Sequence, residues 1–108
     1  MLIKKDDDQE LKIKHNGIRL GIAGATGLVG KMMLKVLEER KIAIANLELY
    51  ASVKSASSII NYLGKEYKVL DIEKTDFQNV DYVLFALDEN IAEKYIEKAL
   101  EANCIVID

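Results

Sequence analysis

The chain has 108 residues, half of them hydrophobic, and a formal net charge of −3 at pH 7. This length allows one small domain with its own core. The negative charge and the lack of a basic stripe argue against nucleic acid as a partner, because its binders neutralise phosphates with lysine and arginine. No apolar run suits a membrane span or a signal peptide, so we expect a cytoplasmic protein without a membrane partner.

Residues 1–17 are expected to form a charged, flexible leader. They carry the acidic run Asp6–Asp8 and show no sustained apolar period beyond a candidate short strand at Leu11–Ile13. His15 is interpreted as a solvated side chain, and a lone histidine supplies no metal site. The folded domain is predicted to span residues 18–108.

The first predicted unit is a strand, a glycine loop and a helix. Residues 18–23 form a short apolar run typical of a buried strand. A helix is predicted from Leu28 to Arg40, with apolar residues on one face and charged residues at its end.

The middle of the chain predicts a second strand and a hairpin. The segment "LELYAS" (47–52) alternates apolar and polar residues as a strand does. In "SIINYLGKEYKVL" (58–70), Gly64 and Lys65 separate two short apolar runs, which indicates a hairpin.

The last third predicts another strand, helix and strand. "DYVLFA" (81–86) is a nearly continuous apolar run, residues 90–102 have helical spacing, and "CIVI" (104–107) reads as a final strand. This alternation predicts an α/β fold of the Rossmann type, in which a doubly wound, mostly parallel sheet carries helices on both faces.

The stretch "GIAGATGLVGK" contains the spacing GxxGxxG at Gly24, Gly27 and Gly30. A tight strand-to-helix turn needs a residue without a Cβ clash, a second where a ligand approaches the backbone, and a third where the helix packs on the strand. The three glycines fit these needs, so the stretch predicts a dinucleotide-binding loop. A glycine turn with a purely structural role is the alternative.

The start of the predicted helix supplies the anion site. Unpaired N–H groups of its first turn, at Leu28 and Val29, favour a pyrophosphate together with the helix dipole. Thr26 adds a hydroxyl group. Met32 follows Lys31 where a nucleoside-triphosphate loop would have Ser or Thr, which argues against that class.

The end of the second strand bears on the choice of coenzyme. NAD sites place an acidic residue about twenty residues past the glycines, whereas NADP sites replace it with hydroxyls and a cation. Here Ser52, Lys54 and Ser55 follow the strand, and the nearest acid, Glu48, lies within it. We therefore predict NADP(H), held by Gly24, Thr26, Gly27, Leu28, Val29, Ser52, Lys54 and Ser55.

Three segments together resemble the N-terminal coenzyme domain of aspartate-semialdehyde dehydrogenase: "IRLGIAGATGLVGKMMLKVLEERK", "LELYASVKS" and "DYVLFALDENIAEKYIEKALEANCIVID". The resemblance covers residues 18–108. It implies NADP phosphates at a loop like GATGxVG and the adenosine 2′-phosphate at a segment like ASxRS. Lys54 stands where the family usually has arginine, which keeps the charge but loses the bidentate geometry.

Other features depart from the family pattern. Where the family has a Ser-Ala-Gly-Gly stretch beside the coenzyme, this chain has Ala86, Leu87, Asp88 and Glu89. Acidic side chains there would repel a polyanion unless they point to solvent or, as we expect of Asp88 or Asn90, cap the next helix.

The resemblance implies NADPH-dependent reduction of an acyl phosphate through a thioester, with the catalytic cysteine and histidine in a downstream catalytic and dimerisation domain. Cys104 lies in an apolar strand context and is interpreted as a small buried hydrophobe. We therefore expect no catalytic or metal-binding residue here, no activity from this chain alone, and homo-oligomers of the full-length protein.

Alternative interpretations come from three directions. A reductase of N-acetyl-glutamyl phosphate shares the coenzyme domain. A short-chain dehydrogenase or epimerase also uses GxxGxxG but would need a Tyr-x-x-x-Lys pair, which we do not expect this chain to supply. A non-catalytic nucleotide-binding domain is favoured modestly by the loss of the glycines after Phe85.

Overall fold

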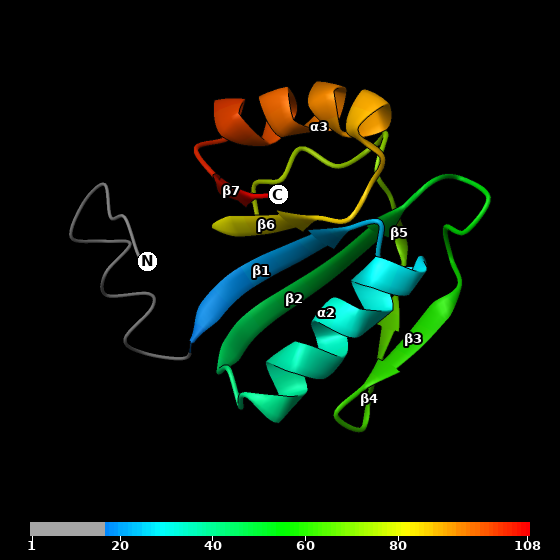
Figure 1. Ribbon diagram of the computed structural model, residues 1–108, viewed down its shortest axis with the longest axis vertical. Helices are drawn as coiled ribbons and strands as arrows, with labels where there is room; N and C mark the ends of the chain where they lie inside the picture. Colours follow the sequence, from blue (N-terminus) through cyan, green and yellow to red (C-terminus); the bar gives the residue numbers. More distant parts are fainter. Residues whose placement is uncertain (1–16) are drawn as a thin grey trace.

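The computed structural model describes residues 17–108 (Figure 1). The main sheet has the order β5-β2-β1-β6-β7, and every neighbouring pair is parallel. The strand order reverses at β1, as in doubly wound sheets. The elements in chain order are β1 (Ile18–Ala23), α2 (Leu28–Glu39), β2 (Ile44–Ala51), β3 (Ile59–Tyr62), β4 (Lys65–Lys68), β5 (Leu70–Asp71), β6 (Tyr82–Phe85), α3 (Glu89–Glu101) and β7 (Ile105–Ile107).

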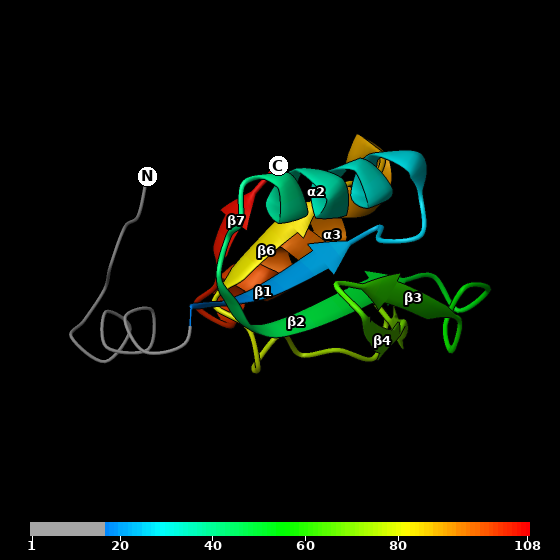
Figure 2. The same cartoon turned by 90° about the horizontal axis from the view of Figure 1, so that it is seen from below.

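The two helices cover opposite faces of this sheet. Leu20 and Ile22 of β1 pack in one cluster with Leu34 of α2, whereas Ala23 belongs to a second cluster with Tyr95 of α3. The antiparallel hairpin of β3 and β4 lies beside β2 as a separate two-stranded sheet (Figure 2). The fold predicted from the sequence, a parallel sheet with helices on both faces, is confirmed.

Several boundaries differ from the predictions. β2 begins at Ile44, three residues before the predicted strand, because Ile44 already pairs with Ile18. The hairpin turn lies at Leu63 and Gly64, which both have positive φ, and not at Gly64 and Lys65. Strand β5 was not predicted. The leader lies outside the described residues except for Gly17, and so do the strand proposed at 11–13 and His15.

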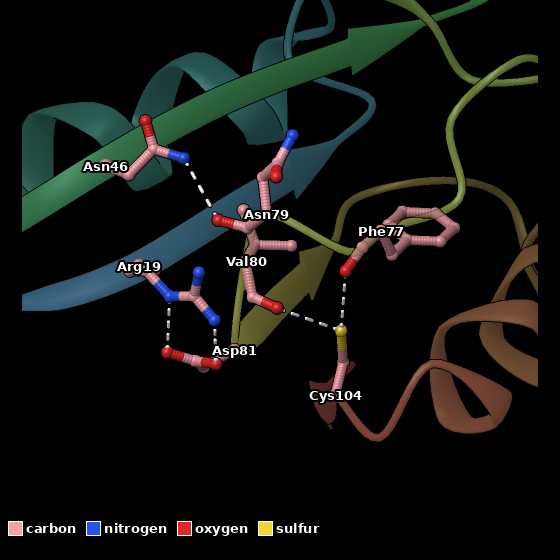
Figure 3. Close-up of polar contacts among 7 residues, drawn as sticks. All are labelled: Arg19, Asn46, Phe77, Asn79, Val80, Asp81 and Cys104. Atoms are coloured by element: carbon pink, nitrogen blue, oxygen red, sulfur yellow. Dashed lines mark hydrogen bonds and ion pairs between the residues drawn. The ribbon is translucent and has the colours of Figure 1, made fainter. Parts of the chain in front are cut away.

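The amino end of the sheet is joined by a bidentate ion pair (Figure 3). Arg19 Nε donates to Asp81 Oδ2 at 2.9 Å and Arg19 Nη2 donates to Asp81 Oδ1 at 2.6 Å. The hydrogen bond with Asp81 raises the pKa of Arg19 above its ordinary value. Because Asp81 comes directly before β6, this pair ties β1 to β6.

No helix among residues 17–108 is long and apolar enough to cross a membrane.

Two glycines allow the loop after β1 to turn tightly beneath α2. Gly24 has φ +90°, a conformation that L side chains rarely adopt, and a Cβ there would lie 2.5 Å from the carbonyl oxygen of Ala86. A Cβ at Gly30 would lie 2.3 Å from the carbonyl oxygen of Gly24 and 2.8 Å from Cα of Ala25. The helix therefore sits on the loop with no room for a methyl group.

We expect Gly30→Ala to lower the free energy of unfolding by about 1–2 kcal/mol, because overpacking against fixed backbone outweighs the roughly 1 kcal/mol that alanine gains in a helix. Gly27→Ser is the control, since a Cβ at Gly27 meets only the Gly24 oxygen at 3.6 Å and serine suits a helix N-cap. Urea unfolding followed by circular dichroism measures both. Equal midpoints for the two variants would contradict this packing.

Candidate functional site

A pocket of about 440 Å³ lies where four parallel strands end. Its lining comes from the loops that follow β1, β2, β5 and β6, and from the first half of α3. In open α/β sheets the crevice at the carboxyl ends of the strands, near the reversal of strand order, is the usual ligand site. The lining residues are Gly24, Thr26, Gly27, Ala51, Ser52, Val53, Ile72, Glu73, Ala86, Leu87, Ile91 and Tyr95.

The glycine loop is fixed at one wall of this pocket. The N–H groups of Gly24 and Ala25 both donate to the carbonyl oxygen of Tyr50, at 2.9 and 3.0 Å, which holds the loop over the end of β2. Gly27 is the exposed N-cap of α2. The N–H groups in the first turn of a helix have no intrahelical partners, so this turn presents donors and the positive end of its dipole.

The structure brings four of the eight predicted coenzyme residues together around the pocket: Gly24, Thr26, Gly27 and Ser52. The other four lie outside its lining. Leu28 and Val29 are in the first turn of α2, with side chains 76% and 53% exposed. Their predicted contribution rests on the backbone, which this placement allows.

Lys54 and Ser55 lie in the turn that follows β2. The turn is closed by the Ser55 N–H, which donates to the carbonyl oxygen of Ser52 at 2.9 Å, and by the Ser58 hydroxyl, which donates to the carbonyl oxygen of Ser55 at 2.6 Å. Lys54 is exposed. The cation therefore directly follows Val53, which lines the pocket, and it lies on a loop whose ends are hydrogen-bonded.

The far wall of the pocket was missed by sequence reasoning. Glu73 follows the two-residue strand β5, and its carboxylate accepts a hydrogen bond from the Tyr95 hydroxyl of α3. Lys94 Nζ lies 3.3 Å from both carboxylate oxygens. The hydrogen bond from Tyr95, and then the one from Lys94, lowers the pKa of Glu73, while the bond to Glu73 and burial raise the pKa of Tyr95 to about 12. Glu73 is thus ionised near neutral pH.

A correction concerns the Tyr-x-x-x-Lys pair, which we did not expect. Tyr50 and Lys54 do have this spacing. Tyr50, however, is fully buried, and its hydroxyl donates to Glu48 Oε1 at 2.8 Å. Burial, and then the bond to Glu48, raises the pKa of Tyr50 well above its ordinary range. Its hydroxyl is therefore not accessible to a substrate, and it stays protonated near neutral pH.

The acidic residues after β6 lie outside the pocket lining. Asp88 occupies the predicted N-cap position of α3, although its side chain makes no capping hydrogen bond, and Glu89 lies in the first turn. Both are exposed. Ala86 and Leu87 do line the pocket, so apolar side chains stand where the family pattern has Ser-Ala.

Cys104 lies away from the pocket lining, at the opposite side of β6 from the glycine loop. Its side chain is buried, and the sulfhydryl lies within hydrogen-bond distance of the carbonyl oxygens of Phe77, at 3.4 Å, and Val80, at 3.3 Å (Figure 3). Among residues 17–108 no group of three or more His, Cys, Asp or Glu side chains is arranged to hold a metal ion.

Comparison with known proteins agrees with this geometry. The chain is 38% identical over 91 residues to aspartate-semialdehyde dehydrogenase of Legionella pneumophila, which covers 84% of the chain and 26% of that protein. The crystal structure of Vibrio cholerae aspartate semialdehyde dehydrogenase II complexed with ASA superposes with a TM-score of 0.81 at 36% identity, over 84% of this chain and 30% of that one.

The Candida albicans enzyme, solved with NADP, shares the fold at 22% identity and a TM-score of 0.65, over 82% of this chain and 28% of that chain. The chain therefore spans about a quarter to a third of the proteins it matches. The family model described as "Semialdehyde dehydrogenase, NAD binding domain" matches residues 19–108. The chain belongs to this family.

Proposed function

We propose that this chain is the NADP-binding domain of an aspartate-semialdehyde dehydrogenase. In the reaction of such an enzyme, NADPH supplies the hydride that reduces aspartyl phosphate to aspartate semialdehyde. The observation that carries the proposal is the pocket at the ends of β1, β2, β5 and β6, with the glycine loop and the start of α2 on its wall. The names of the relatives supply the substrate.

The residues present fit the phosphates of a dinucleotide. A Cβ built at Gly27 meets no protein atom closer than 3.6 Å, so the space beside this N-cap is open, and it faces the pocket. The Thr26 side chain lines the same wall. A pyrophosphate here would accept hydrogen bonds from N–H groups of the first turn of α2. A volume of about 440 Å³ is within the usual range for small-molecule sites.

The preference for NADP over NAD rests on the loop after β2. Ser52 lines the pocket and Lys54 is exposed two residues later, which suits a 2′-phosphate. The acid nearest to this loop in sequence, Glu48, accepts a hydrogen bond from the Tyr50 hydroxyl and another from Asn79 Nδ2 at 3.4 Å. Glu48 is therefore engaged within the strand layer and is a poor candidate for binding a ribose hydroxyl.

The groups that carry out the chemical step would come from outside residues 17–108. Thioester chemistry needs an accessible thiol and an acid–base group. Cys104 is buried against carbonyl oxygens, so it does not meet the first need. We propose that a separate domain supplies both groups and the contacts for homo-oligomer formation, in keeping with the larger size of the relatives.

The first prediction from the proposed function tests the glycine loop. Gly27→Val should leave the domain folded and abolish NADP binding measured by calorimetry, because the branched side chain would occupy the open space at the N-cap. Gln78→Val, an exposed position away from the pocket, is the control and should bind like the parent. Unchanged affinity in a folded Gly27→Val variant would refute this binding site.

The second prediction tests the coenzyme preference. Lys54→Ala should weaken NADP by about tenfold and leave NAD nearly unchanged, because only NADP carries the 2′-phosphate. The loss should shrink at high salt, since screening weakens the charge contact in the parent. Lys68→Ala, on the exposed face of β4, controls for net charge. Equal losses for both coenzymes, or tighter NAD binding by the parent, would contradict the preference.

The third prediction concerns activity. The 108-residue chain should show no turnover of aspartate semialdehyde with phosphate and NADP in an absorbance assay for NADPH. Cys104→Ala should behave identically, because the buried sulfur cannot reach a substrate. Turnover by the parent that disappears in Cys104→Ala would show that the role assigned to Cys104 is wrong.

A further inference from the structure

A second pocket lies between α2 and the hairpin of β3 and β4. It has a volume of about 400 Å³, and its walls come from α2 and from all four residues of β3, Ile59–Tyr62. Figure 1 shows α2 alongside this hairpin. The second pocket shares no lining residue with the pocket at the ends of the parallel strands. Coenzyme binding at the glycine loop therefore leaves it unexplained.

The hydroxyl of Tyr62 has no hydrogen-bond partner in the described part of the chain. Tyr62 lines the second pocket and is only 7% exposed, and its hydroxyl oxygen is fully buried. Buried polar groups in folded proteins almost always have a partner. Burial, and then the charge of Glu38, raises the pKa of Tyr62, so the hydroxyl keeps its proton near neutral pH. A ligand that accepts a hydrogen bond from this hydroxyl would offset the cost of burying it.

Three charged side chains of α2 line the same pocket. Lys31, Lys35 and Glu38 stand at positions i, i+4 and i+7, which share one face of a helix. All three are exposed, and the ion pairs formed within residues 17–108 join other residues. With a rise of about 1.5 Å per residue, Glu38 lies roughly 4.5 Å from Lys35 along the helix axis. The pocket therefore presents a positive and a negative group within reach of one small ligand.

Aliphatic side chains complete the lining. Leu34 of α2 is buried, Ile60 is half-buried and Ile59 is 51% exposed. An apolar group that covers Ile59 would remove hydrocarbon surface from water, which favours binding. A simple inorganic ion would leave this part of the lining uncovered. The pocket therefore suits a ligand that combines charged groups with an apolar side chain.

We infer that the second pocket binds a free α-amino acid with a large apolar side chain. Lys35, with Lys31 beside it, pairs with the carboxylate, and Glu38 pairs with the ammonium group. The exposed side chains of α2 move aside as the ligand enters, and the Tyr62 hydroxyl then donates to the carboxylate. The apolar side chain of the ligand packs against the aliphatic part of the lining. This inference goes beyond the proposed function and does not depend on NADP binding.

The test is a titration of the ¹⁵N-labelled 108-residue chain with L-leucine, followed by the NMR shifts of its backbone amides. The shifts should saturate and concentrate at residues 31–38 and 59–62. L-Leucinamide and N-acetyl-L-leucine each lack one of the two charges, so each should bind about threefold more weakly. Equal binding of the three compounds would overturn the inference. So would the absence of saturable shifts, or inorganic phosphate that binds these residues as tightly as L-leucine.

Two charge variants assign the partners of the ligand. Lys35→Gln and Glu38→Gln should each weaken L-leucine binding by about threefold. Lys35→Gln should leave the affinity for L-leucinamide unchanged, and Glu38→Gln should not weaken N-acetyl-L-leucine, because each analogue lacks the charge concerned. Lys74→Gln and Glu39→Gln remove the same charges from exposed positions outside the lining and should bind L-leucine like the parent. Losses in these controls equal to those in the lining variants would contradict the assignment.

Tyr62→Phe tests the buried hydroxyl with two measurements. It should weaken L-leucine binding by about tenfold, because it removes a hydrogen bond to a charged group. The urea midpoint of the ligand-free variant should equal or exceed that of the parent, since an unpartnered buried hydroxyl lowers stability. A lower midpoint would show that the hydroxyl already has a partner, and unchanged L-leucine affinity would show that the ligand does not use it. Either result would overturn the inference, whereas failure of the chain to bind NADP would refute only the proposed function.

Discussion

The approach of Gly30 to the carbonyl oxygen of Gly24 is the constraint on which the rest of the site depends. A helix that rests on the loop without an intervening side chain has its axis set by backbone contact alone. The loop in turn is held by two N–H groups that donate to the carbonyl oxygen of Tyr50. The direction of the α2 dipole is therefore fixed relative to the ends of β1 and β2 before any ligand arrives.

This rigidity has a reason in binding energetics. A loop that had to order itself around a pyrophosphate would lose affinity to conformational entropy. Here the loop is anchored from beneath by β2, and the buried ring of Tyr50 contacts Phe77 edge-on at a centroid distance of 5.1 Å. The anchoring residue thus belongs to the core shared with α3. The position of the glycine loop is therefore supported by the packing of Tyr50 in this core.

The sequence indicated the glycine-loop side of the pocket and missed the opposite side, for physical reasons. Three glycines at fixed spacing between a strand and a helix have few structural explanations. The local sequence was therefore enough to indicate this loop. Glu73 follows a strand of only two residues, and a strand this short shows no hydrophobic periodicity from which it could be predicted. Tyr95 fits the apolar spacing of α3, so its hydroxyl contact with Glu73 depends on tertiary structure alone. The early start of β2 likewise follows from pairing with β1.

The Glu73 carboxylate in the pocket lining is compensated electrostatically by its neighbours. Lys94 Nζ lies 3.3 Å from the Glu73 carboxylate, and the hydroxyl of Tyr95, the next residue of α3, donates a hydrogen bond to the same carboxylate. Lys54 stands on the neighbouring loop after β2. Lys54 and Glu73 therefore place opposite charges on the neighbouring loops after β2 and β5. Such an arrangement orients a ligand that is strongly charged at one point and neutral at another.

The ion pair of Arg19 with Asp81 lies at the amino end of the parallel strands, together with the hydrogen bond from Asn46 to the carbonyl of Asn79. The pocket lies at the carboxyl end of the same strands. Substitutions at one end of the strands can therefore accumulate without disturbing contacts at the other end. Mutations in the loops after β2 and β5 can change the lining of the pocket while the strand-to-strand ties persist. Related chains can therefore differ in the loops around the pocket without needing further substitutions that restore stability.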